Sequence, residues 1–232
     1  MKRLANPKGF FYDPSLVLYL PLYKLDGASF MSKDAYGHLC TATGAPWGIQ
    51  GRAFDGDDKI DCGDKAQFSF EHNTPFSILM WFKPSDTTAW SSLVTKITVA
   101  NVFRGYAFLQ TNAGKLTASI INTNVIARKR IVVDSDAAIT QDVFQLVGFT
   151  YDGGGASAGV IIYRNDAVFA STSSEDTLGG LTIDNTVSLL IGDREEGDIP
   201  ANGTFGEVWV YNRVVSLIEV QNIYLATKWR YR

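Results

Sequence analysis

The stretch that decides the fold runs from Phe144 to Ser171 and reads FQLVGFTYDGGGASAGVIIYRNDAVFAS. Two β-rich runs, Phe144–Tyr151 and Gly159–Arg164, are separated by the turn residues of the Asp152–Gly155 segment. Asn165 and Asp166 then form a two-residue loop of the type that closes a hairpin through a primed turn before Ala167–Ser171. Strands at this spacing predict antiparallel pairing.

The same pattern of short β-rich runs extends through the rest of the chain. The other predicted strands are Leu16–Pro21, Gly37–Ala42, Ala53–Cys62 with a turn at Gly56–Asp58, Phe76–Lys83, Ser92–Ile97, Tyr106–Thr111, Lys115–Ile121, Ser188–Gly192 and Gly203–Tyr211. Only Val215–Ala226 has apolar residues at helical spacing, with Ser216 as its candidate N-cap. The sequence therefore predicts an all-β fold of two packed antiparallel sheets with one short C-terminal helix.

Length and composition indicate one large domain and exclude several classes of partner. The chain has 232 residues and a net charge of −3, and no linker or repeat divides it. That charge gives no field for attracting nucleic acid. No apolar run approaches the roughly 20 residues needed to cross a bilayer. The basic N-terminal residues are followed by no apolar stretch of the kind found in a secretory signal, so we expect neither membrane insertion nor a signal peptide.

The order of motifs points to a family. The motifs are LVLYLPL at Leu16–Leu22, GRAFDGDDKIDCG at Gly51–Gly63, FSILMWFKP at Phe76–Pro84, LVGFTYDG at Leu146–Gly153, VIIYRNDAVFAS at Val160–Ser171, SLLIGD at Ser188–Asp193 and GTFGEVWVYNRVVSLIEVQNIY at Gly203–Tyr224. This series resembles the concanavalin A-like lectin/glucanase superfamily, in its laminin G-like and pentraxin-like branch. The resemblance implies a jelly-roll sandwich over residues 15–226, with an N-terminal arm (1–14) and a C-terminal tail (227–232) outside it. It also implies a binding role.

An acidic turn is the candidate metal site. Asp55, Asp57, Asp58 and Asp61 offer several of the hard oxygen ligands that calcium prefers. Relatives often hold calcium where this region meets acidic residues near the first and last strands. This chain departs from that pattern, because Tyr23 and Lys24 follow the first strand and Gly206 precedes Glu207. The alternative interpretation is a hairpin turn whose aspartates cap their own backbone.

Catalytic arrangements fit the sequence poorly, and we predict that the chain is not an enzyme. Glycanases of this superfamily carry carboxylates that alternate along one strand, because retaining cleavage needs an acid and a nucleophile on one face. The acidic segment 193–198 follows a strand and does not alternate. The two histidines, His38 and His72, stand in no recognisable arrangement with a nucleophile.

Four aromatic residues are the candidate ligand or partner contacts: Trp90, Trp209, Tyr211 and Trp229. Trp90 lies in a polar loop, and the alternation of the last strand places Trp209 and Tyr211 on its outward face. Trp229 lies in a tail of aromatic and basic residues that suits docking on a partner or folding back on its own domain. Exposed aromatic rings stack on sugars or fill protein interfaces, and partial burial under a loop is the plain alternative.

The two cysteines, Cys40 and Cys62, are compatible with a disulfide and at least as well with two buried free thiols.

Two functional hypotheses follow. The first is a structural or decoration protein on a virus particle, such as a phage, or on another extracellular surface, reached without an export signal. The second is a carbohydrate-binding lectin module assisted by calcium. The expected partners are proteins of an assembled particle, glycans, or further copies of the chain.

Overall fold

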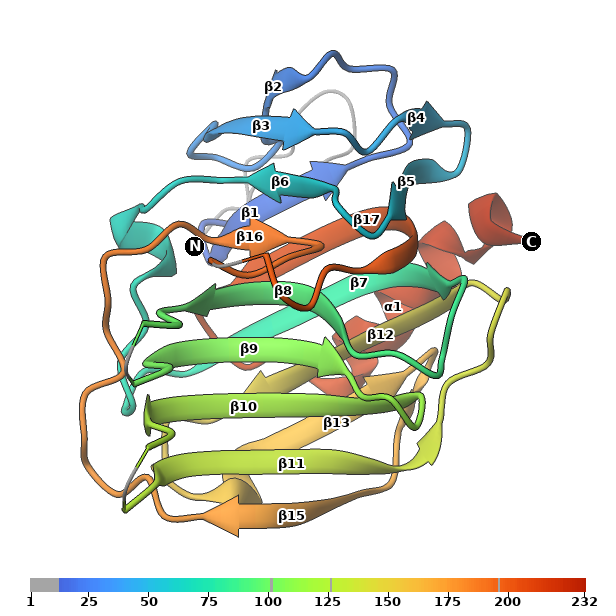
Figure 1. Ribbon diagram of the computed structural model, residues 1–232. Helices are drawn as coiled ribbons and strands as arrows, with labels where there is room; N and C mark the ends of the chain where they lie inside the picture. The colour runs from blue at the N-terminus through green and yellow to red at the C-terminus, as the bar shows by residue number, and fades with distance from the viewer. Residues whose placement is uncertain (1–12, 101, 126, 196) are drawn as a thin grey trace, which may run out of the picture.

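The computed structural model describes residues 13–232 except 101, 126 and 196, and in it two antiparallel sheets pack face to face as a sandwich (Figure 1). The nine-stranded sheet has the order β15-β11-β10-β9-β8-β16-β6-β3-β2. The bounds of its strands are β2 Ser29–Met31, β3 Leu39–Thr43, β6 Lys59–Asp61, β8 Ser91–Ile97, β9 Gly105–Gln110, β10 Lys115–Thr123, β11 Lys129–Ala138, β15 Ser171–Asp176 and β16 Leu190–Ile191.

The second sheet has eight strands in the order β14-β13-β12-β7-β17-β5-β4, with β1 also paired to β17. The bounds of its strands are β1 Leu16–Pro21, β4 Trp47–Gly48, β5 Gly51–Asp55, β7 Phe76–Pro84, β12 Gln145–Tyr151, β13 Val160–Arg164, β14 Ala167–Val168 and β17 Asn202–Tyr211. Short 3-10 turns lie at Ala66–Phe68, Ser157–Gly159 and Lys228–Tyr231, and the α-helix α1 spans Leu217–Thr227.

The central strands of the eight-stranded sheet are buried on both faces. In β7, Ile78 and Met80 belong to the core between the sheets, whereas Leu79 and Trp81 belong to a second apolar cluster beneath α1 and the C-terminal 3-10 turn. A strand covered on both faces is apolar at every position rather than at alternate ones. This double burial explains the unbroken apolar run FSILMWF.

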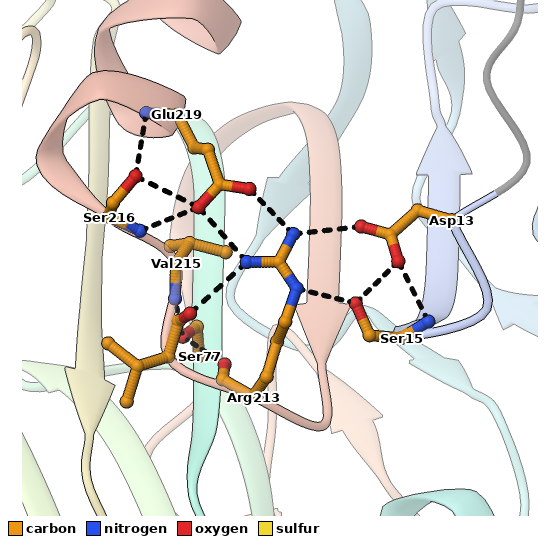
Figure 2. Close-up of polar contacts among 8 residues, drawn as sticks. Asp13, Ser15, Ser77, Arg213, Val215, Ser216 and Glu219 are labelled. Atoms are coloured by element: carbon orange, nitrogen blue, oxygen red, sulfur yellow. Dashed lines mark hydrogen bonds and ion pairs between the residues drawn. The ribbon is translucent and has the colours of Figure 1, made fainter. Parts of the chain in front are cut away.

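The start of α1 is held by a capping box and by one arginine (Figure 2). Ser216 accepts a hydrogen bond from the backbone N–H of Glu219, and the Glu219 carboxylate accepts one from the backbone of Ser216. The Arg213 guanidinium donates to Glu219 at 2.7 Å and to Asp13 at 2.8 Å. It therefore joins the segment before β1 to the helix that covers the sheet.

The structure confirms the two-sheet sandwich, the helix with its Ser216 cap and the hairpin at Asn165, whose φ is 58°. The prediction of a hairpin at Gly56–Asp58 is wrong, because β5 and β6 belong to different sheets and this turn connects one sheet to the other. The N-terminal arm predicted at 1–14 lies outside the described residues up to residue 12. Among the residues described, no helix has the length and apolar character needed to cross a membrane.

Candidate binding groove on the nine-stranded sheet

The two sheets differ in what covers their outer faces. The helix and the C-terminal turn cover the eight-stranded sheet, whereas β8 to β11 and β15 lie at the front of Figure 1 with no helix over them. A groove of about 300 Å³ follows this face. Its lining residues are Trp90, Ile97, Phe103, Ala107, Leu109, Thr117, Ser119, Ile121, Asn124, Arg130, Val132, Asp134, Ser174 and Arg194.

The floor of the groove is apolar and has small side chains at its centre. Ser119 of β10 lies between Ala107 of β9 and Val132 of β11 in the pairing register. Ala107 also packs with the buried Ile121 in a separate apolar cluster that lies outside the sandwich core. Ala107, Ser119 and Ile121 are buried, so the part of the apolar floor that a ligand can reach is formed by the half-buried side chains of Leu109 and Val132.

One wall is formed by Arg130, which is held in place by partners on both sides. Its Nε donates to Glu175 Oε2 at 2.6 Å, a second nitrogen donates to the same carboxylate, and a third donates to the side-chain oxygen of Asn124. The hydrogen bonds from Arg130 lower the pKa of Glu175 to about 2. The guanidinium is therefore a fixed donor, and it shares the Glu175 carboxylate with Arg128, which donates to Oε1 at 3.1 Å.

A carboxylate with hydroxyl partners lies on the same side of the groove. Asp134 accepts hydrogen bonds from the hydroxyl groups of Thr117 and Ser174, the latter at 2.8 Å. Thr117 is the residue directly opposite Asp134 on β10. This pairing positions the carboxylate oxygens over the sheet, where they can accept further hydrogen bonds from a ligand.

The opposite wall carries Arg194. Its guanidinium donates two hydrogen bonds to Asp198, which lower the pKa of that carboxyl, and it lies 5.3 Å from the centre of the Phe103 ring. Both arginines of the groove thus have carboxylate partners. The result is a surface with polarised donors and acceptors around an apolar floor and with little net charge.

The structure separates the four predicted aromatic contacts. Trp90 lines the groove and is 43% exposed, and Trp229 is exposed on the C-terminal turn, away from the groove. Trp209 and Tyr211 do point outward from the sandwich core, as the alternation predicts, but both are buried. The prediction that they contact a ligand is wrong, because the helix and tail cover that face of the sheet.

The C-terminal tail folds back on its own domain. Tyr231 is buried and donates to Glu207 Oε2 at 3.0 Å, and Arg230 donates to the same atom at 2.8 Å. Gly206 makes this contact possible, since a Cβ at that position would lie 2.4 Å from the Tyr231 ring. The glycine that departs from the family pattern therefore has a structural explanation in this chain.

The acidic turn brings together three of its four aspartates. Ligand oxygens of Asp55, Asp57 and Asp58 lie within 4.8 Å of one another, whereas Asp61 is not part of this group and accepts from the backbone of Gly63. Asp58 is buried and accepts backbone N–H groups from Ala45 and Asp55. Backbone capping is therefore present, as the alternative interpretation predicts, although the turn is not the hairpin which that interpretation assumed.

The same three carboxylates supply some, but not all, of the oxygen ligands that a calcium ion needs. The hydrogen bond with Asp57 and the negative charges of Asp58 and Asp57 raise the pKa of Asp55, which shows that the group is crowded with like charge. Because calcium takes six to eight oxygens, the three carboxylates would leave several positions to water and backbone oxygens. None of the three lines the groove.

The acidic residues of the segment after β16 make separate structural contacts. Asp193 is buried, Glu195 accepts from the backbone N–H of Val99, and Asp198 pairs with Arg194. These residues hold the loop beside the groove. That the chain is not an enzyme stays a prediction.

Most of the groove could not be identified from the sequence, because two of its strands are polar. The segment KRIVVDSDAA of β11 alternates, with Ile131 and Val133 facing the core and Arg130 and Asp134 facing out. That alternation is the signal in the sequence that indicates an outward polar face on this strand. The edge strand β15 reads STSSED and carries no apolar pattern from which it could be predicted.

Comparisons with known proteins agree with this architecture. A family model described as the concanavalin A-like lectin/glucanases superfamily matches residues 54–221. No curated protein sequence matches the chain.

Solved structures share the fold at low sequence identity. The binding domain of Paraclostridial Mosquitocidal Protein 1 has a TM-score of 0.66 at 14% identity, over 92% of this chain and 52% of that one. Trypanosoma rangeli sialidase has a TM-score of 0.66 at 13% identity, over 99% of this chain and 36% of that one.

A third structure is the CBM40 module of Ruminococcus gnavus IT-sialidase bound to α2,3-sialyllactose, with a TM-score of 0.52 at 21% identity over 65% of this chain and 82% of that one. The chain spans about half the length of the mosquitocidal protein structure and about a third of the sialidase. At these identities the likeness is one of fold.

Proposed function

Because the chain belongs to the concanavalin A-like lectin/glucanase superfamily, we propose that it is a non-catalytic carbohydrate-binding module whose site is the groove on the nine-stranded sheet. The observation that carries the proposal is the combination of an apolar floor, an exposed tryptophan at one end and fixed polar groups on the walls. Sugars have an apolar C–H face and a rim of hydroxyl groups. Trp90 and the apolar floor can pack against the C–H face, and Arg130 and Asp134 can form hydrogen bonds with the hydroxyl groups.

The charge balance of the groove favours a neutral glycan. Arg130 and Arg194 are each bonded to a carboxylate, so an anionic sugar would have to compete with Glu175 or Asp198 for its partner. A neutral hydroxyl can accept from a remaining guanidinium N–H without breaking either ion pair. Such binding should change little with ionic strength, since screening acts mainly on unpaired charge.

A glycan array tests this proposal with two tryptophan variants. Trp90→Ala should weaken binding to neutral glycans about 10-fold or more, in line with the loss of one stacking surface. Trp229→Ala removes an exposed tryptophan outside the groove and should bind like the wild type. Equal loss in both variants, or binding confined to sialylated or sulfated glycans, would contradict the proposal.

We propose that calcium, if the acidic turn binds it, supports the structure and does not contact the glycan. The support for this division is that Asp55, Asp57 and Asp58 converge on one another and lie outside the groove lining. Repeating the array with a chelator should leave binding unchanged. Binding that disappears on chelation and returns with calcium would place the ion in the recognition mechanism instead.

A second candidate function is display on an assembled extracellular particle, such as a phage virion. It is favoured by an exposed aromatic surface apart from the groove, where Arg230 lies 3.6 Å from the centre of the Tyr23 ring and 4.7 Å from that of the exposed Trp229. Surfaces of arginine and aromatic residues are common at protein interfaces. Mass spectrometry of purified particles should detect the chain, and its confinement to cell extracts would exclude this function.

A further inference from the structure

Cys40 and Cys62 occupy directly opposed positions on neighbouring strands. Thr41 pairs with Asp61 and Ala42 with Ile60 between β3 and β6, and one further step of this register sets Cys40 against Cys62. Residues opposed in an antiparallel pair have side chains on the same face of the sheet. Both cysteines are fully buried members of the sandwich core, and both are free thiols.

The hydrogen bonds of the flanking strands define the type of pair. The backbone N–H of Cys62 donates to Leu189 O at 2.9 Å, on the β16 side, and that of Ala42 donates to Ala28 O at 2.7 Å, on the β2 side. Cys40 and Cys62 therefore form a non-hydrogen-bonded pair, for which the Cα atoms lie about 4.5 Å apart. This separation is within the range of about 4.4–6.8 Å that a disulfide requires.

We propose that Cys40 and Cys62 form a modification site, at which the two thiols are oxidised to a cross-strand disulfide when the protein meets an oxidising environment. The oxidant is a small-molecule disulfide such as oxidised glutathione. One thiolate attacks it to form a mixed disulfide and releases one glutathione. The second cysteine then displaces the second glutathione, so the two cysteines are oxidised and the oxidant is reduced to two thiols that carry away the two protons.

The fold controls how readily this step occurs. A hydrogen bond with Cys40 and burial raise the pKa of Cys62 well above its usual value, so the thiol is unreactive while the sheet is closed. β2 has only three residues and lies at the edge of the sheet next to β3. Transient opening of this edge would expose Cys40 first, and closing would bring the mixed disulfide onto Cys62.

The bond would enclose a defined part of the molecule. Between the two cysteines the chain leaves the nine-stranded sheet, passes through β4 and β5 of the other sheet and returns at β6. This loop contains the acidic turn. Closing a loop of this size restricts the unfolded chain, so we expect the melting temperature to rise by about 5–10 °C.

The test is oxidation of the reduced, folded protein with oxidised glutathione, followed by intact-mass measurement and thermal melting. The expected product is a monomer that has lost the mass of two hydrogen atoms, carries no glutathione, yields a peptide linked through Cys40 and Cys62, and melts at a higher temperature. Cys40→Ala and Cys62→Ala variants should gain neither the internal bond nor the rise in melting temperature.

Three results would overturn the proposal. Both thiols could persist at every temperature below the melting transition, glutathione adducts or linked dimers could accumulate instead, or the internal bond could form without raising the melting temperature. Since the oxidation and the melting are measured on the wild-type protein, poor folding of a cysteine variant does not affect the outcome.

Discussion

At the scale of single residues, Lys96 is a charged side chain that is almost completely buried. Its ammonium group is fully buried and donates to Asp64 Oδ1 at 2.9 Å, to the backbone oxygens of Asn185 and Val187 at 2.9 Å each, and to Asn185 Oδ1 at 3.2 Å. Four oxygens around one cation compensate for its removal from water. They also hold the segment after β15 against β8.

Replacing this lysine should be costly. Lys96→Met keeps the apolar stem but leaves the oxygens without their donor, and we expect a loss of about 3–5 kcal/mol in the free energy of unfolding. Denaturant unfolding measures the loss, with Lys115→Met at the start of β10 as the control, expected to change stability by about 0.5 kcal/mol or less. A loss below about 1 kcal/mol for Lys96→Met would show that the four oxygens around the ammonium group contribute little to the free energy of unfolding.

The Arg213 cluster of Figure 2 predicts a pH dependence. Hydrogen bonds from Arg213 lower the pKa of Glu219 to about 2, below the value of about 4.3 expected in the unfolded chain. Because the folded-state pKa is the lower one, the stabilisation is fully present above the unfolded pKa and is lost as the pH falls toward about 2.

Unfolding measured from neutral pH down to about pH 2.5 tests this linkage. Glu219→Gln should be less stable than the wild type at neutral pH, and the difference should shrink as the pH falls. Arg213→Gln leaves the carboxylate in place without its partner and should show a similarly weakened dependence below about pH 4.5. A difference between wild type and variant that stays constant with pH would contradict the assignment.

At the scale of single elements, the C-terminal turn depends on Gly206. A methyl group at this position would meet the Tyr231 ring, so Gly206→Ala should lower stability by about 2 kcal/mol. In a Tyr231→Ala background the same change should cost much less, because the clashing ring is absent. Equal costs in the two backgrounds, measured by denaturant unfolding, would mean that the glycine acts through its own backbone.

The elements differ in how far the sequence predicts them. Strands with a strong apolar pattern, such as β7 and β12, and the capped helix α1 are predicted almost to the residue. The sequence places Trp209 on the outward face but does not indicate that the helix and tail cover it, since that contact depends on residues distant in the chain. The polar strand β15 lacks any local signal because its pairing with β11, rather than its own composition, makes it a strand.

The candidate site shows the same division. Of the four predicted aromatic contacts, Trp90 is the one that the structure places in the groove. It could be predicted because an aromatic residue in a polar loop is visible in the sequence. Arg130, Asp134 and Arg194 come from segments that meet only in the folded sheet. The acidic turn was identified from its composition, but its position between the two sheets depends on the topology.

At the scale of the whole molecule, the two sheets differ in how far their outer faces are covered. The helix and C-terminal turn close the outer face of the eight-stranded sheet, which leaves the groove on the nine-stranded sheet. The central claim is that glycans bind in this groove, and blocking its floor tests the claim without altering its charges. Ser119 lies at the centre of the floor, and Thr41 is exposed on β3 of the same sheet, outside the groove lining.

The most direct measurement is a binding isotherm for the strongest array glycan with wild type, Ser119→Tyr and Thr41→Tyr. The account predicts that Ser119→Tyr abolishes measurable binding, while Thr41→Tyr binds within about 2-fold of the wild type, since a tyrosine there adds bulk but occludes nothing. Folding of both variants is verified by their melting curves. Binding that persists in a folded Ser119→Tyr variant would contradict the claim and place the glycan elsewhere on the molecule.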